Sequence, residues 1–92
     1  MIRSFAHKGL ENFFLTGNLK GIQAQHVAKL ARLLDRLDAA ARVEDMEFPG
    51  AGLHPLKGDL DGLWSVKVSG NWRLTFRFES GDAYFVNYWD YH

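Results

Sequence analysis

The sequence WSVKVSGNWRLTFRFE, residues 64–79, alternates apolar and polar side chains on both sides of Ser69-Gly70. Such alternation with a period of two is typical of half-buried strands, and a tight turn between two such runs predicts an antiparallel hairpin. A second turn at Ser80-Gly81-Asp82 leads into the apolar run AYFVNYW, residues 83–89. We therefore expect three consecutive antiparallel strands joined by two tight turns.

The middle strand of this predicted sheet has two unlike faces. One face is apolar and carries Trp72, Leu74, Phe76 and Phe78, whereas the other carries Arg73, Thr75 and Arg77. Successive side chains of a strand point to opposite sides of the sheet. The apolar face must therefore pack against a second layer, and the face with the two arginines points away from it.

The residues before this sheet supply the second layer as two helices. Leu10, Phe13 and Phe14 have the i, i+3, i+4 spacing of a short helix that ends at Thr16-Gly17-Asn18. A longer helix is predicted from about Gln23 to Ala41, and its apolar face comprises Val27, Leu30, Ala31, Leu34, Leu37 and Ala41. Residues 1–5 predict a short strand, and residues 44–52 show no regular period. The prediction is a single α+β domain over residues 1–92, with a two-layer fold in which both helices pack on one face of a mainly antiparallel sheet.

Composition excludes several functional classes. The 92 residues include no cysteine, which rules out disulfides, thiolate nucleophiles and cysteine-based zinc sites. No apolar run reaches the ~18 residues of a membrane span, and the first residues lack the apolar core of a signal peptide, so we expect a cytoplasmic protein without membrane contact. Eleven basic residues balance eleven acidic ones, so contact with RNA or DNA has to come from a local cluster.

Three separate stretches carry residues suited to chemistry on a phosphate. His54 and Lys57 lie in a loop with Pro55 and Gly58, although a surface imidazole bonded to a carbonyl and a solvated lysine would fit the same spacing. The planar fork of Arg73 suits a phosphate, but this side chain also has possible ion-pair partners across the sheet, which are Glu79, Asp82 and Asp90.

The third stretch is the end of the chain, Asp90-Tyr91-His92. Terminal residues are normally solvated and without a role. Here an apolar strand leads directly into them, so we expect this end to be anchored beside the sheet. The three stretches together provide imidazoles, cations, a carboxylate and a phenol.

This set of groups matches the demands of RNA cleavage through the neighbouring 2′-hydroxyl. The reaction needs a base for the 2′-hydroxyl, an acid for the departing 5′-oxygen and cationic donors for the charged phosphorane, and it needs no metal or cofactor. The set works only if the three stretches converge in the fold. Two other histidines, His7 and His26, are predicted to be surface residues without metal-ligand spacing, and three aromatic residues are predicted to belong to the core, namely Trp64, Trp72 and Tyr84.

The segments HPLKG (54–58), GLWSVKV (62–68), NWRLTF (71–76) and NYWDYH (87–92) closely resemble the HigB-type toxins of the RelE superfamily. The resemblance implies a type II toxin that cleaves mRNA in the ribosomal A site, and a cognate HigA-type helix-turn-helix antitoxin through which the pair binds operator DNA. Carried over by position, the catalytic residues are His54, Asp90, Tyr91 and His92, and the phosphate-binding residues are Lys57 and Arg73. The resemblance leaves open which group is the base and which the acid.

Two other functions remain compatible with the sequence. The related ParE toxins share this architecture but inhibit DNA gyrase, and toxicity that persists with unchanged mRNA after His92→Ala would indicate that function. A non-catalytic module that only binds an antitoxin would cause no growth arrest when expressed.

Overall fold

A computed structural model describes residues 1–91 and places four antiparallel strands in the order β1-β2-β3-β4. The three long strands are β2 (Trp64–Ser69), β3 (Trp72–Glu79) and β4 (Asp82–Asp90), as the alternation predicts. The turn between β3 and β4 has positive φ angles at Ser80 (50°) and Gly81 (83°), the pattern of a tight two-residue hairpin. A fourth strand, β1 (His54–Pro55), was not predicted and pairs with β2 at the sheet edge.

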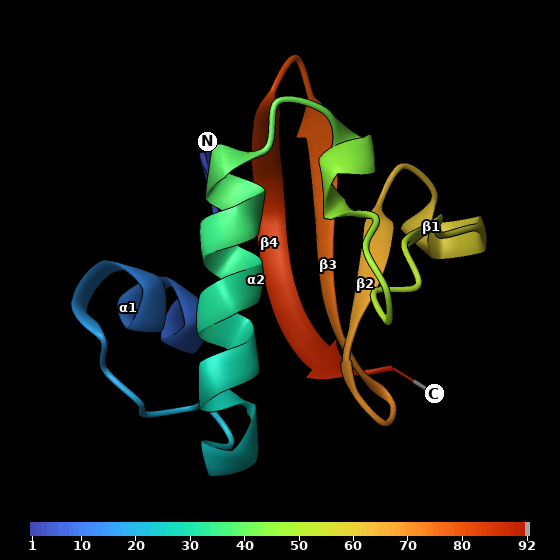
Figure 1. Ribbon diagram of the computed structural model, residues 1–92. Coiled ribbons are helices and arrows are strands. Elements are labelled where there is room, and N and C mark those ends of the chain that lie inside the picture. Colours follow the sequence, from blue (N-terminus) through green and yellow to red (C-terminus); the bar gives the residue numbers. More distant parts are fainter. Residues whose placement is uncertain (92) are drawn as a thin grey trace.

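Both predicted helices are present and lie on one side of the sheet (Figure 1), so the α+β prediction is confirmed. They are α1 (Lys8–Thr16) and α2 (Val27–Ala39). Three short 3-10 segments lie outside them, η1 (Ala24–His26), η2 (Val43–Met46) and η3 (Gly58–Leu60). The core between the helices and the sheet is formed by Leu10, Leu30, Leu33, Leu34, Leu37, Met46, Ala51, Val66, Val68, Leu74, Phe76, Ala83, Val86 and Tyr88.

The buried face of α2 differs in part from the predicted one. Leu33 is 2% exposed and belongs to the core, although the predicted face omitted it. Ala41 was predicted to be buried but is exposed, because α2 ends at Ala39 and the chain turns away into η2. The helix itself begins four residues later than predicted, since Ala24–His26 is a 3-10 turn.

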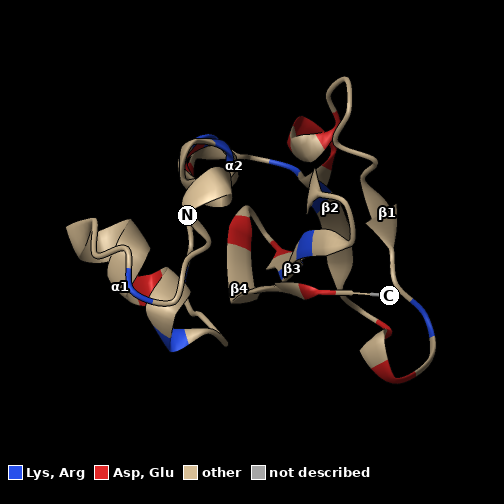
Figure 2. Ribbon diagram, turned by 90° about the horizontal axis from the view of Figure 1, so that it is seen from below, with Lys and Arg blue, Asp and Glu red and all other residues tan. Residues whose placement is uncertain are grey.

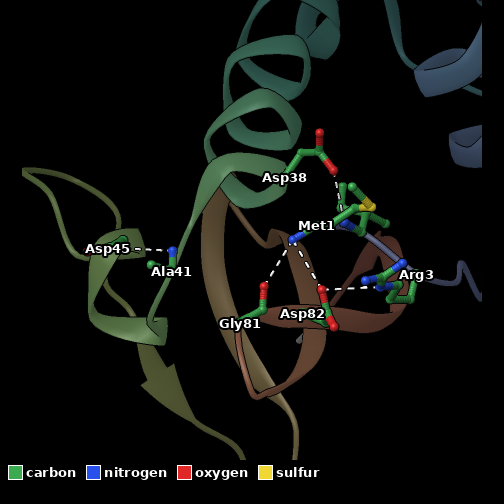
Figure 3. Close-up of polar contacts among 8 residues, drawn as sticks. Met1, Arg3, Asp38, Ala41, Asp45, Gly81 and Asp82 are labelled. Atoms are coloured by element: carbon green, nitrogen blue, oxygen red, sulfur yellow. Dashed lines mark hydrogen bonds and ion pairs between the residues drawn. The ribbon is translucent and has the colours of Figure 1, made fainter.

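The first residues run parallel to β4 but form only two isolated bridges, Ile2 to Ala83 and Phe5 to Val86, instead of the predicted strand. Polar contacts hold this segment to the β3–β4 turn on one side and to α2 on the other (Figure 3). The Met1 amino group donates to the Gly81 carbonyl at 2.9 Å, and Arg3 pairs with Asp82 at 3.1 Å. The backbone N–H of Ile2 donates to Asp38 of α2 at 2.8 Å. The segment therefore connects α2 to the β3–β4 turn.

Two histidines are packed against the sheet, so the prediction that both are surface residues was wrong. His26 is 3% exposed and its Nδ1 is hydrogen-bonded to the Tyr88 hydroxyl at 2.5 Å. His7 is half-buried, and its Nδ1 accepts the Leu10 N–H at the start of α1 at 2.9 Å. The rings of His7 and His26 both contact the Tyr88 ring, and His26 also contacts Trp72. Sequence periodicity could not reveal the burial of His26, because its hydrogen-bond partner Tyr88 lies 62 residues further along the chain, in β4.

Removing the Tyr88 hydroxyl is expected to change the alkaline stability of the protein. Burial raises the pKa of Tyr88, so above pH ~10 the unfolded chain releases a proton that the folded chain keeps. The free energy of unfolding therefore falls as pH rises through this range, and Tyr88→Phe should flatten that decline. The variant should also lose about 1–3 kcal/mol at neutral pH, because His26 loses its partner. Urea unfolding of both proteins at several pH values tests this, and parallel declines would contradict it.

Candidate functional site

The face of the sheet that the helices leave uncovered, here called the open face, carries the candidate residues. Strand pairing places His54 opposite Ser65, Ser65 opposite Thr75, and Thr75 opposite Asn87. Residues directly opposite one another in antiparallel strands project to the same side. The helices contact the alternate side through Leu74 and Phe76. His54 therefore belongs to a row of polar residues that crosses the open face.

Arg73 lies in the next row of the same face, opposite Lys67 on one side and Trp89 on the other. The Arg73 backbone lies two strands away from the His54 backbone and is offset from it by two residues along the strand. The distance between the two backbones is therefore about 12 Å. Both side chains are long enough to approach one phosphodiester from this separation. Arg73 and His54 are thus brought together on one surface by the sheet.

Hydrogen bonds to the β2–β3 turn orient the Arg73 guanidinium. Its Nη1 donates to the Gly70 carbonyl at 2.6 Å and to the Trp72 carbonyl at 3.1 Å. These two bonds use only Nη1, and a guanidinium has further N–H groups at Nε and Nη2 for a phosphate. Two of the expected ion-pair partners of Arg73 pair elsewhere, Glu79 with Arg77 at 3.6 Å and Asp82 with Arg3 at 3.1 Å.

The loop that carries His54 is fastened on both sides of this residue. The Lys67 N–H donates to the Ala51 carbonyl and the Leu56 N–H to the Leu63 carbonyl, each at 2.8 Å, and both Ala51 and Leu56 are buried. The His54 ring is held as well, since its Nδ1 lies 2.8 Å from the Gly52 carbonyl. A carbonyl only accepts, so Nδ1 carries the proton and Nε2 is the nitrogen left for proton transfer in the neutral ring.

Lys57 lies two residues beyond β1 and is exposed just before η3. The described residues give its side chain no ion pair or hydrogen bond, which leaves its ammonium group to solvent or to a ligand. The pairing of β1 extends only over His54 and Pro55, so strand register does not place Lys57 in a row of the open face.

Tyr91, the last described residue, is tied to the sheet by its backbone. The Tyr91 N–H donates to the Asn71 carbonyl of the β2–β3 turn at 2.8 Å. On the open face, the Tyr91 ring contacts the Trp89 ring at 5.0 Å, and the Trp89 indole N–H donates to the Thr75 hydroxyl at 2.9 Å. Tyr91 therefore borders the row that contains Arg73.

Asp90, unlike Tyr91, does not lie on the open face. Asp90 pairs with Trp72 in the register and is two residues from Tyr88, so strand alternation assigns it to the helix side at the end of the sheet. Its two neighbours in the chain, Trp89 and Tyr91, point to the open face instead. His92 lies outside the residues that the structure describes.

Sequence reasoning missed three residues on the open face. Lys67 is exposed directly opposite Arg73 and adds a second cation to that row. Ser65 is fully buried opposite His54, and its hydroxyl has no hydrogen-bond partner in the described chain. Tyr84 was predicted to belong to the core, but it lies opposite Arg77, whose guanidinium is 5.2 Å from its ring. Their positions depend on strand register, which alternation alone does not fix.

Neither a metal site nor a membrane segment is found in residues 1–91. No group of three or more His, Asp or Glu side chains is placed to hold a metal ion in this range. None of the helices there has the length and apolar character needed to cross a bilayer.

Known proteins resemble this chain over almost its whole length. Residues 3–92 match the family described as RelE-like toxin of type II toxin-antitoxin system HigB. This chain belongs to the HigB-like toxin family. A curated relative, Endoribonuclease HigB from Proteus vulgaris, is 47% identical over 92 residues and covers all of both chains. The resemblance expected from the sequence segments is therefore confirmed, and an antitoxin is the partner that membership of this HigB-like family implies.

Proposed function

We propose that this HigB-like toxin is an endoribonuclease that cleaves mRNA on the ribosome, in the A site. The observation that supports the proposal best is the placement of His54 and Arg73 on adjacent rows of the open face, with the loop and the turn holding each group in position. An imidazole and a guanidinium at this separation can act on the same phosphodiester. The name of the Proteus vulgaris relative points to the same reaction.

The proposed reaction is transfer of the phosphoryl group within the RNA. A base removes the proton from a 2′-hydroxyl, the 2′-oxygen forms a bond to phosphorus, and the bond from phosphorus to the 5′-oxygen breaks. An acid then gives a proton to the departing 5′-oxygen, which leaves a cyclic phosphate and a 5′-hydroxyl. Arg73 stabilises the charge of the phosphorane, as does Lys57 in this proposal.

Proton transfer is assigned to His54, Asp90 and His92 as a group, and Tyr91 orients the nucleotide or assists. His54 can serve either as base or as acid, because its Nε2 accepts a proton in the neutral ring and donates one in the imidazolium. The assignments of Asp90, Tyr91 and His92 rest on the resemblance of NYWDYH to the family pattern.

We propose that the ribosome positions the mRNA for a toxin whose own net charge is zero. Its eleven basic and eleven acidic residues balance, so long-range attraction to naked RNA is weak, and in this proposal the ribosome supplies the positioning. A defined mRNA should therefore be cut by the purified protein in the presence of ribosomes and remain intact without them. Efficient cleavage of the naked RNA would contradict this part of the proposal.

Substitution of the terminal imidazole separates this function from its alternatives. His92→Ala should abolish mRNA cleavage and growth arrest while the thermal unfolding midpoint stays unchanged. Mapping of mRNA ends after expression in growing cells measures the cleavage directly. If the variant stayed toxic while its mRNA remained intact, a gyrase inhibitor of the ParE type would be indicated.

The partner in this proposal is a HigA-type helix-turn-helix antitoxin. The toxin then reaches operator DNA only through the antitoxin, and both act in the cytoplasm together with the ribosomes. Co-purification of the two proteins with an operator fragment tests this, and binding of the toxin alone to the fragment would contradict it.

A further inference from the structure

A groove on the helical side of the molecule has no role in the proposed reaction. It has a volume of about 310 Å³ and is lined by Lys29, Arg32, Leu33, Arg36 and Phe48. Its floor is apolar, because Leu33 belongs to the core and Phe48 packs against the core. The groove lies between α2 and the chain that follows η2, both of which are on the helical side of the sheet in Figure 1.

The rim of this groove is cationic. Lys29, Arg32 and Arg36 are three and four residues apart, so they project from one face of α2. Arg36 is fixed in place, since its Nε donates to the Asp45 carbonyl at 3.1 Å and its guanidinium lies 4.4 Å from the centre of the Phe48 ring. The ion pairs found in residues 1–91 involve neither Lys29 nor Arg32.

A second hollow of about 440 Å³ continues from the first and has the opposite charge. The two share Arg36, and the second is lined mainly by Ala39, Ala40, Glu44, Asp45 and Glu47. Backbone N–H groups of Arg42 and Ala41 hold the pKa of Asp45 below its usual range, so this carboxylate stays ionised. Figure 2 shows the basic positions on α2 and the acidic positions on the neighbouring η2. The charge therefore changes sign along the combined groove.

We infer that this two-signed groove is a docking site for the antitoxin. It would take a polypeptide segment with an apolar side chain over Leu33 and Phe48, carboxylates facing Lys29 and Arg32, and a cation facing Glu44 and Glu47. Amphipathic helices bind hydrophobic grooves in this way, with flanking charges that set the register. The inference uses family membership for the existence of an antitoxin and is independent of the proposed cleavage reaction.

A polypeptide fits this groove better than RNA does. An RNA strand carries negative charge at every nucleotide, so the part that followed the groove past Arg36 would meet the carboxylates of Glu44, Asp45 and Glu47. Stacking of a base on Phe48 is also hindered, because the Arg36 guanidinium already covers one face of that ring. A polypeptide can carry both signs of charge within two helical turns.

Charge reversal at the two ends of the groove tests the inference. Arg32→Glu and Glu44→Lys change exposed side chains, and each should weaken binding of the purified cognate antitoxin about 10-fold in a low-salt titration. The difference from the wild-type protein should shrink as salt is raised, since salt screens surface charges. Lys20→Glu is the matched control for Arg32→Glu, because it reverses an exposed cation that does not line either hollow, and its affinity should stay within about 2-fold.

Two results would overturn the docking site. The first is unchanged antitoxin affinity in Arg32→Glu and Glu44→Lys together with weaker binding to ribosomes, which would assign the groove to RNA. The second is an equal loss in Lys20→Glu, which would show an effect of net charge alone. Thermal unfolding verifies that each variant is folded. A protein that fails to cut RNA but binds the antitoxin through this groove would contradict the proposed enzyme and leave the docking site standing.

Discussion

Arg73→Ala is expected to lower the rate of mRNA cleavage about 10²–10³-fold while the protein stays folded. The loss corresponds to removal of one donor that stabilises the charge of the transition state. Because the guanidinium is oriented by the carbonyls of Gly70 and Trp72, it is already in place when the RNA binds. Cleavage of a defined mRNA in a purified translation system measures the rate, and Arg73→Lys should recover only part of it, since an ammonium lacks the planar fork.

Arg77→Ala provides the control for this prediction. Arg77 lies on the same strand and the same face, about 13 Å further along, where it pairs with Glu79 and contacts the rings of Tyr84 and Phe85. Its removal should change the cleavage rate by no more than a few-fold. Equal losses in both variants would show that any cation on this face suffices, and a lowered unfolding midpoint in Arg73→Ala would assign that residue a structural role.

His54→Ala should lower the same rate about 10²–10⁴-fold, the usual effect of removing a group that transfers a proton. The buried Ala51 and Leu56 on either side of the loop should keep its path unchanged. Substrate affinity should be affected less than the rate of the chemical step. Single-turnover cleavage on pre-bound ribosomes separates these two quantities.

His54→Asn separates proton transfer from a purely structural role of this ring. The asparagine side-chain amide can donate to the Gly52 carbonyl much as Nδ1 does, but it has no group that exchanges a proton near neutral pH. Both variants should therefore be equally inactive. Recovery of most of the rate in His54→Asn would show that His54 acts by anchoring the loop.

The two layers of the fold could be predicted from the sequence, because apolar side chains recur with the period of a strand in the sheet and with the period of a helix in α1 and α2. Alternation over residues 64–79 identified two strands, and the stripes on α1 and α2 identified the helices that cover them. The candidate residues were selected for their chemistry, the family resemblance assigned their roles, and the structure adds that His54 and Arg73 share a surface. The two-residue strand β1 was not predictable, because it exists only through pairing with β2.

Register was the other property that sequence alone could not provide. Extending the pairing from the Ser80-Gly81 turn without interruption would place Tyr88 opposite Arg73. An irregularity between Thr75 and Arg77 adds one residue to β4, so Trp89 takes that position and Tyr88 faces the helices. Phe85, within the added stretch, has a φ of 55° and is 49% exposed. One inserted residue thus decides which aromatic side chains border the candidate site.

The segment at the start of the chain protects the sheet against unwanted association. Unpaired strand edges are templates for aggregation, and natural proteins shorten or cover them. Bridges from Ile2 and Phe5 cover the outer edge of β4. At the opposite edge of the sheet, β1 is only two residues long, and the Ala51 carbonyl accepts a hydrogen bond from the Lys67 N–H. Blunted margins of this kind should let the chain accumulate without polymerising when no partner covers it.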